Sequence, residues 1–207
     1  MKIFSLKDVS FKNIINYPAL EIPENRAVFV CGESGCGKST LLKLLNGTAS
    51  ADSGEILYRE KPLEEYEPVL LRREILLCGQ SAFLFDGNIA ENFAQYYKYR
   101  ELPPPQPEEY REYLKICSAE FPEDANCTTM SGGERHRVFT AICLSLKPKV
   151  LLIDEPTAAL DDATADAVLG GIKNYCADNN ITLVVVSHSR ALAEAYADSV
   201  IMLGGAT

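Results

Sequence analysis

The segment that decides the fold is Gly32-Glu-Ser-Gly-Cys-Gly-Lys-Ser-Thr40, which satisfies the pattern G-x-x-x-x-G-K-[ST]. It directly follows an apolar run at 27–31 and directly precedes a helical segment at 41–46, so strand, loop and helix occur in the order that a phosphate-binding loop requires. Glycines let the backbone turn its N–H groups toward a polyphosphate, and the start of the next helix adds the positive end of its dipole. The segment therefore predicts an α/β fold that binds a nucleoside triphosphate.

The side chains of this phosphate loop match that chemistry. Lys38 supplies a mobile positive charge for the terminal phosphates, and Ser39 offers a hydroxyl to Mg²⁺, which prefers oxygen ligands. Cys36 is predicted to lie near bound phosphate, where a reactive thiol would sense metals or oxidants. We expect the whole loop to contact the nucleoside triphosphate, through Gly32, Glu33, Ser34, Gly35, Cys36, Gly37, Lys38, Ser39 and Thr40.

Composition excludes several classes of protein. The 207 residues are 47% hydrophobic and 24% charged, which is typical of one ordinary globular chain. The net charge of −9 argues against a nucleic-acid partner and against a polybasic membrane-surface protein, because both need a positive field. The longest apolar runs, such as 150–153 and 183–186, are far shorter than the roughly 20 residues that cross a bilayer. Charges interrupt the first residues, so no secretory signal is predicted and we expect a cytoplasmic chain.

The seven cysteines have no C-x-x-C spacing and no paired Cys/His cluster, so we expect reduced thiols rather than disulfides or a metal site. Strand and helix signals alternate along the chain. Between 85 and 128 the strand signal disappears, and two helical segments, 88–100 and 108–118, flank the proline-rich run at 103–107. This middle part is predicted to be a small helical insert. The expected strands are 2–11, 27–31, 54–59, 75–78, 150–153, 182–186 and 199–203, and the expected core helices are 38–46, 132–146, 162–177 and 189–197.

Polar residues follow three of the predicted strands. Asp154 and Glu155 end the apolar run at 150–153, Gln80 follows 75–78, and His188 follows 182–186. Ligands collect at the carboxyl ends of strands in an open α/β sheet. Asp154 is predicted to hold Mg²⁺, and Glu155 to orient or deprotonate the attacking water. Gln80 is predicted to contact Mg²⁺ or that water, and His188 to donate to a γ-phosphate oxygen.

A second anion-binding turn is predicted at Ser131-Gly132-Gly133-Glu134, where a serine and two glycines open a helix. One nucleotide does not usually need two phosphate cradles from the same chain. The turn is therefore predicted to cap a nucleotide that a partner subunit holds, which implies a dimer.

The order of these motifs, together with Ala159-Leu160-Asp161, resembles the nucleotide-binding subunit of ATP-binding cassette (ABC) transporters over essentially the whole chain. The resemblance implies that residues 131–134 are the ABC signature, that Asp161 belongs to the D-loop, and that Gln80 and His188 are the Q-loop and switch residues. It implies a head-to-tail dimer, with a second copy or a homologous ATPase, around two ATP molecules. The chain departs from the family pattern at Met130 and Glu134, where leucine and glutamine are common.

The same resemblance implies one ABC ATPase domain over 1–207. An α/β nucleotide-binding core with an antiparallel β lobe would occupy 1–80 and 146–207, and a helical insert would occupy 81–145. Asn13 stands where an aromatic side chain for adenine stacking is expected, so either Phe11 or Tyr17 takes that role or the stacking is weak.

The implied function is a Mg²⁺-dependent ATPase that powers transport through a separate transmembrane permease, with the chain peripheral on the cytoplasmic face of the membrane. Residues 80–92 resemble exporter-type subunits, and Phe83, Leu84 and Phe85 are the predicted contacts with the permease. The region also resembles small ATP-binding subunits of metal or iron exporters. The alternative is an ABC ATPase without a transport role, in iron–sulfur cluster assembly or in regulation of another machine.

Overall fold

The computed structural model describes residues 1–158 and 160–204. An antiparallel sheet is built on β1 (Lys2–Phe11), which pairs with β2 (Ile15–Asn16), β3 (Leu20–Pro23) and β5 (Ser53–Tyr58), and β5 pairs in turn with β6 (Lys61–Pro62). The predicted strands at 2–11 and 54–59 are confirmed. Strands β2, β3 and β6 were not predicted, and of these β2 and β6 have only two residues each, too few to show the alternation of a half-buried strand.

The second sheet is parallel and has the order β10-β4-β9-β8-β7. Its strands β7 (Ile75–Cys78), β8 (Val150–Asp154) and β9 (Thr182–Val186), with β4 (Ala27–Gly32) and β10 (Ser199–Leu203), confirm the sequence prediction to within one residue. Alternate side chains of β8 enter two different cores, Leu151 and Ile153 on one face and Val150 and Leu152 on the other. The central strands β4, β8 and β9 are almost entirely apolar because both faces of the sheet are covered there, whereas Val200 and Met202 of the edge strand β10 are exposed.

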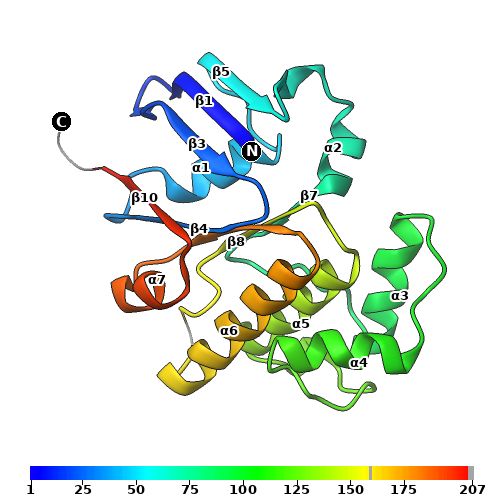
Figure 1. Cartoon of the computed structure of the whole chain (residues 1–207). Coiled ribbons are helices and arrows are strands. Elements are labelled where there is room, and N and C mark those ends of the chain that lie inside the picture. The colour runs from blue at the N-terminus through cyan, green and yellow to red at the C-terminus, as the bar shows by residue number, and fades with distance from the viewer. Residues whose placement is uncertain (159, 205–207) are drawn as a thin grey trace.

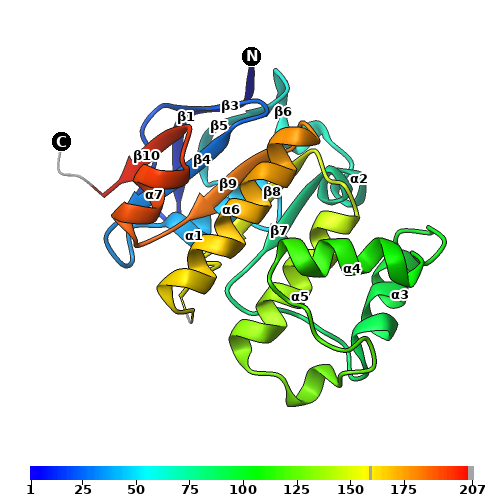
Figure 2. The same ribbon diagram turned by 60° about the horizontal axis from the view of Figure 1, so that its bottom comes forward.

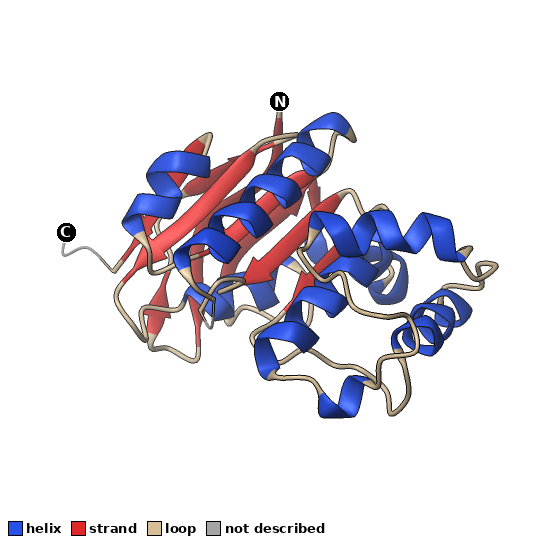
Figure 3. Ribbon diagram, turned by 90° about the horizontal axis from the view of Figure 1, so that it is seen from below, coloured by secondary structure: helices blue, strands red, loops and turns tan. Residues whose placement is uncertain are grey.

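Helix α1 (Lys38–Leu45) lies between the two sheets (Figure 1). Its leucines share one core with side chains of β1 and of the parallel sheet. The other face of the parallel sheet is covered by α5 (Gly132–Ser145), α6 (Asp162–Asp178) and α7 (Arg190–Tyr196), as Figure 3 shows from below. Of the helices in the described part of the chain, none is long and apolar enough to cross a membrane.

The middle of the chain is helical, as predicted. Helices α3 (Ile89–Tyr99) and α4 (Pro107–Ile116) lie beside α5 at one end of the molecule (Figure 2), and the fully described segment 85–128 contains no strand, only an isolated bridge between Asn88 and Asn126. Helix α2 (Pro68–Glu74) was missed. Its sequence signal is local: Pro68 stands at the first helical position, and the Glu67 carboxylate caps the helix by accepting from the Leu70 N–H at 2.7 Å.

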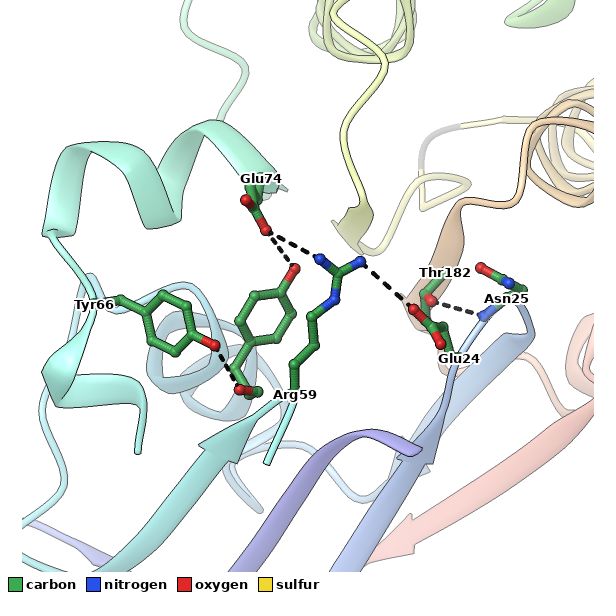
Figure 4. A network of polar contacts seen from close by, with 7 residues as sticks. Glu24, Asn25, Arg59, Tyr66, Glu74 and Thr182 are labelled. Atoms are coloured by element: carbon green, nitrogen blue, oxygen red, sulfur yellow. Dashed lines mark hydrogen bonds and ion pairs between the residues drawn. The ribbon is translucent and has the colours of Figure 1, made fainter. Parts of the chain in front are cut away.

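A polar network fastens the antiparallel sheet to α2 and to the turn before β4 (Figure 4). The Tyr58 hydroxyl at the end of β5 donates to Glu74 Oε2 at 2.9 Å, and the Arg59 guanidinium lies 3.7 Å from Glu74 and 3.5 Å from Glu24. Burial raises the pKa of Tyr58, so its hydroxyl stays a neutral donor. The Tyr66 hydroxyl donates to the carbonyl of Tyr58 at 2.8 Å, which completes the attachment of the segment before α2.

Two adjacent glycines in α6 provide a test of the packing between α6 and α4. A Cβ atom at Gly171 would lie 2.4 Å from the carbonyl oxygen of Ile116, whereas a Cβ at Gly170 would have Tyr196 Cε1 as its nearest neighbour, at 3.5 Å. We expect Gly171→Ala to lower the free energy of unfolding by about 1–3 kcal/mol, because the backbone of Ile116 must shift. The matched variant Gly170→Ala should raise it by up to about 1 kcal/mol through helix propensity. Urea unfolding measures both, and equal effects of the two variants would contradict this packing.

Candidate functional site

The phosphate loop is supported from beneath by the antiparallel sheet. Gly37 adopts a left-handed conformation with φ 98°, and the Tyr17 hydroxyl donates to its carbonyl oxygen at 2.8 Å. A Cβ at position 37 would lie 2.8 Å from Ile15 Cγ2 and 2.9 Å from the Tyr17 oxygen, so the loop and the β2–β3 segment pack without space for a side chain. The loop is therefore positioned by residues far from it in the sequence.

Tyr17 does not offer its ring to a nucleotide base. The side chain is buried, and burial raises its pKa to about 12, which keeps the hydroxyl a donor to Gly37. The expectation that Tyr17 could stack on adenine is wrong, because its ring already packs in the core between the two sheets. The half-buried Phe11 remains the aromatic candidate, and the Lys12 ammonium lies 5.5 Å from its ring centroid.

Lys38 lies inside the curve of the loop. Its ammonium donates to the carbonyl oxygens of Gly32 at 3.0 Å and Glu33 at 2.8 Å, and it lies 4.0 Å from the Cys36 sulfur. Cys36 is the half-exposed cysteine, whereas the other six are buried, and all seven are free thiols. The expectation of free thiols is confirmed, and Cys36 stays the cysteine predicted to lie near phosphate.

The carboxyl end of β8 carries the two predicted acidic residues. Asp154 is only 4% exposed, and its Oδ1 has no hydrogen-bond partner within the described residues. Burial raises the pKa of Asp154, and the neighbouring Ser39 hydroxyl and Lys38 ammonium partly offset that shift. The structure therefore brings Asp154 next to Ser39 of the phosphate loop, although 115 residues separate them in the sequence.

Glu155 and His188 form a pair beside Asp154. Glu155 has a left-handed backbone conformation, φ 54°, and its N–H donates to the carbonyl oxygen of Val186 at 3.0 Å. Its Oε1 lies 2.7 Å from Nε2 of His188. A non-glycine residue in this conformation costs of order 1 kcal/mol and is typical of functional sites. A cavity of about 430 Å³ adjoins the pair, and its lining includes Leu160, Ser189 and Leu192.

Gln80 is exposed two residues beyond the end of β7. Because Cys78 pairs with Ile153 across the sheet, Gln80 leaves the sheet at the same edge as Asp154. The sequence prediction that places Gln80, Asp154, Glu155 and His188 at one edge of the sheet agrees with this arrangement.

The turn at 131–134, called the Ser131 turn below, begins α5 with a capping box. The Ser131 hydroxyl accepts from the Glu134 N–H at 3.3 Å, and the Ser131 N–H donates to Glu134 Oε2 at 2.8 Å. The bonds from the backbone N–H and the hydroxyl of Ser131 hold the pKa of Glu134 below its ordinary value. Within residues 1–158 and 160–204, no hydrogen bond or ion pair joins this turn to the phosphate loop. Glu134 thus caps its own helix.

Asp161 likewise caps a helix. Its carboxylate accepts from the backbone N–H of Thr164 at 3.0 Å and from the Thr164 hydroxyl at 2.7 Å, and these bonds lower its pKa. Ala159, the first residue of the predicted D-loop motif, lies outside the described residues. The predicted contact of Asp161 with nucleotide stays a prediction.

The contacts that two residues of α5 make with the chain on either side of Gln80 and Phe83 escaped the sequence analysis. His136 in α5 has its Nε2 3.1 Å from the carbonyl oxygen of Gly79, and Arg135 donates to the carbonyl oxygens of Leu84 and Cys127. Burial lowers the pKa of His136, so its ring is neutral near pH 7. A single histidine in a helix is a weak sequence signal for a specific contact. No nearby residue in the sequence indicates that its partner is Gly79.

Comparison with known proteins gives the same assignment as these motifs. The family model described as "ABC transporter" matches residues 15–158. "Methionine import ATP-binding protein MetN" of Corynebacterium jeikeium is 35% identical over 188 residues, which cover 88% of this chain and 51% of that protein. "Probable iron export ATP-binding protein FetA" of Escherichia coli is 32% identical over 199 residues, covering 95% of this chain and 85% of that protein. FetA is a small subunit of the kind that the sequence resembles, and import subunits such as MetN match this chain at similar identity.

Solved structures share the fold. The structure of cbiO1 from Clostridium perfringens, described as part of the ABC transporter complex cbiONQ, superimposes with a TM-score of 0.83 at 24% identity, over 98% of this chain and 84% of that one. A bacterial Atm1-family ABC exporter with ATP bound gives a TM-score of 0.85 at 25% identity, over 97% of this chain and 36% of that one. The chain spans about half the length of the MetN protein. The match over residues 15–158, and the similarity to FetA over most of both lengths, show that this chain belongs to the ABC transporter family.

Proposed function

We propose that this chain binds and hydrolyses ATP with Mg²⁺ and that hydrolysis powers transport through a separate membrane subunit. The observation that carries the proposal is the gathering of a phosphate loop, a buried carboxylate and the Glu155–His188 pair at one edge of the parallel sheet. Parallel strands present their carboxyl ends at that edge, where ligands of open α/β sheets bind.

The polar groups beside the phosphate loop fit a magnesium ion. Asp154 Oδ1 is buried without a hydrogen-bond partner in the described chain, and the Ser39 hydroxyl is its neighbour, so these oxygen atoms suit a hard cation. Ser39, Asp154 and Gln80 would hold Mg²⁺. When bound, the ion supplies positive charge that neutralises the phosphate oxygens.

Glu155 is suited to activate water. In the hydrolysis of ATP, a water oxygen attacks the γ-phosphorus, the bond to the ADP oxygen breaks, and the water proton passes to a base. His188 occupies one oxygen of the Glu155 carboxylate at 2.7 Å, which leaves the other oxygen to accept from the water. Lys38 would neutralise charge on the terminal phosphates, and donation from His188 to a γ-phosphate oxygen stays a prediction.

We also propose that two such chains, or this chain and a homologous ATPase, close head to tail on ATP. The Ser131 turn is exposed at Ser131 and Gly132, and among residues 1–158 and 160–204 none of its hydrogen bonds reaches the phosphate loop. The N-terminus of α5 can therefore offer its backbone donors to the phosphates of a nucleotide held by the partner. Asp161 would join the same interface.

A membrane subunit would dock on aromatic side chains that follow Gln80. Phe83 is 61% exposed and packs edge-to-face on Phe85 at 5.0 Å, and Phe85 lies 5.8 Å from the exposed Tyr99. The prediction that Leu84 shares this surface is wrong, because Leu84 is buried in the core with the α5 side chains. The docking surface we propose is therefore Phe83, Phe85 and Tyr99, which would hold the chain on the cytoplasmic face of the membrane.

The test is purification of the chain from its native membrane with complexes intact, followed by identification of what co-elutes. A stoichiometric multi-span protein is the expected result, and its loss in a Phe83→Ala/Phe85→Ala variant would support the docking surface. A soluble partner, or none when Glu155→Gln is trapped with ATP, would contradict a transport role. Partner binding unchanged in the double variant would contradict the docking surface alone.

Glu155→Gln should separate binding from hydrolysis. The amide keeps the size of the side chain but cannot accept a proton, so we expect the rate of phosphate release to fall by about 10²–10⁴-fold while the Kd for ATP changes little. Glu112→Gln, an exposed change on α4, is the control and should retain turnover. Near-normal turnover of Glu155→Gln would remove Glu155 from the role of base.

Tyr17→Phe tests whether the hydroxyl or the ring of Tyr17 serves the nucleotide. The variant keeps the ring and loses only the hydrogen bond to Gly37, so we expect the Kd for MgATP, measured by calorimetry, to rise roughly fivefold. Tyr99→Phe at an exposed position should leave the Kd unchanged. An unchanged Kd for Tyr17→Phe would show that the phosphate loop does not depend on this bond.

A further inference from the structure

Two consecutive residues of α5 hold the backbone of the segment that carries Gln80. His136 Nε2 lies 3.1 Å from the carbonyl oxygen of Gly79, directly before Gln80, and Arg135 Nη2 donates to the carbonyl oxygen of Leu84 at 3.3 Å. Residues 79–85, called the Gln80 segment below, are thus held near both ends by the helix that begins at the Ser131 turn.

The geometry of the His136 contact fixes its hydrogen-bond role. A carbonyl oxygen only accepts, so Nε2 of His136 must carry the hydrogen and donate it. The side chain is 7% exposed, and a buried donor that lost this partner would leave two polar groups unsatisfied. The contact therefore holds the start of the Gln80 segment at one distance from α5.

The far end of the Gln80 segment is held equally well. The Phe85 N–H donates to Asn92 Oδ1 at 2.8 Å, and Asn92 Nδ2 donates back to the Phe85 carbonyl at 3.2 Å. Asn92 is fully buried in α3, and Arg135 also donates to the Cys127 carbonyl in the loop before α5. Between these anchors, the side chains of Gln80 and Phe83 are exposed.

We propose that Arg135 and His136 are positioning residues that make the Ser131 turn, Gln80 and Phe83 move as one rigid unit. This inference rests on the proposed function, because it assigns the Ser131 turn to the partner's nucleotide, Gln80 to this chain's own nucleotide and Phe83 to the membrane subunit. A displacement of the turn as it meets a nucleotide is passed to the Gln80 segment through hydrogen bonds from the side chains of Arg135 and His136 to the backbone carbonyls of Leu84 and Gly79. The remainder of α5 is buried against the sheet, so its first turn has a rigid base.

Arg137 provides the internal comparison. It lies on the same helix, one residue further, and carries the same charge as Arg135, but its Nε donates to the carbonyl oxygen of Ser118 at 3.1 Å and its guanidinium lies 5.8 Å from the Phe121 ring. Arg137 therefore ties α5 to the segment after α4, whereas Arg135 and His136 tie it to the Gln80 segment.

The experiment compares His136→Leu, Arg135→Ala, His136→Gln and Arg137→Ala in the full chain. Leucine fills the space of the imidazole but cannot donate, whereas the glutamine amide can donate to Gly79. Three quantities are measured for each variant: amide hydrogen exchange of residues 79–86, the equilibrium Kd for MgATP, and kcat for phosphate release. The thermal midpoint of each variant is recorded to separate general destabilisation from a local effect.

We expect His136→Leu and Arg135→Ala to speed exchange in residues 79–86 and to lower kcat at least about fivefold, the factor that corresponds to the loss of one ordinary hydrogen bond, with the Kd changed less than about twofold. His136→Gln should restore slow exchange and kcat. Arg137→Ala should leave both at the wild-type level, even where its thermal midpoint falls as far as that of Arg135→Ala.

Exchange in residues 79–86 that stays at the wild-type rate in both His136→Leu and Arg135→Ala would overturn the inference. Equal loss of kcat in Arg137→Ala would also overturn it, because the effect would then follow from general destabilisation. If His136→Leu fails to fold, Arg135→Ala decides, since Arg135 is only half buried. A wild-type chain that neither binds nor hydrolyses MgATP would refute the proposed function instead, and the exchange data would still report on the contacts of Arg135 and His136.

Discussion

The packing of α1 between the two sheets is the interaction on which the rest of the structure depends. Leu41, Leu42, Leu44 and Leu45 are completely buried, and their core includes side chains of both sheets. Burial of each such side chain stabilises the fold by roughly 1.5–3 kcal/mol. Helix α1 begins six residues after β4 ends, and its buried leucines fix it against the sheet. Its N-terminus is therefore held at the carboxyl edge of the parallel sheet. The phosphate loop is the short connection between β4 and α1, and this packing fixes both of its ends.

The same edge concentrates opposite charges in a small volume. Lys38 and Asp154 are both nearly buried there, and neither has an ion-pair partner of its own within the described chain. Burial disfavours the ionised form of Asp154, so its raised pKa reflects a carboxylate that gains from a nearby cation. Glu155, by contrast, is paired with His188 and held in a left-handed conformation. Two adjacent carboxylates of one strand end thus have different surroundings and are suited to different tasks.

Helix α5 connects this edge to the remainder of the chain. Its body is buried among the strands and α3, α4 and α6. Its first turn begins at the Ser131 turn and contacts the Gln80 segment through His136. The exposed aromatic surface of Phe83, Phe85 and Tyr99 lies on the outside of the same segment. The sites proposed for nucleotide, for a second ATPase and for a membrane subunit are therefore separated along the chain, and all three lie close to this one helix.

The sequence by itself determined the parallel sheet, its covering helices, the phosphate loop and the residues at the strand ends, because each of these is a contiguous pattern of residue types with a fixed period or order. Short elements such as β2 and α2 carried too few residues for a period to appear. Only the tertiary structure decided that Tyr17 supports Gly37, that Leu84 is buried beside an exposed Phe83, and that His136 holds Gly79. The bonds concerned join residues 20 and 57 positions apart, and no local pattern specifies a partner at such a separation, since folding alone brings the two together.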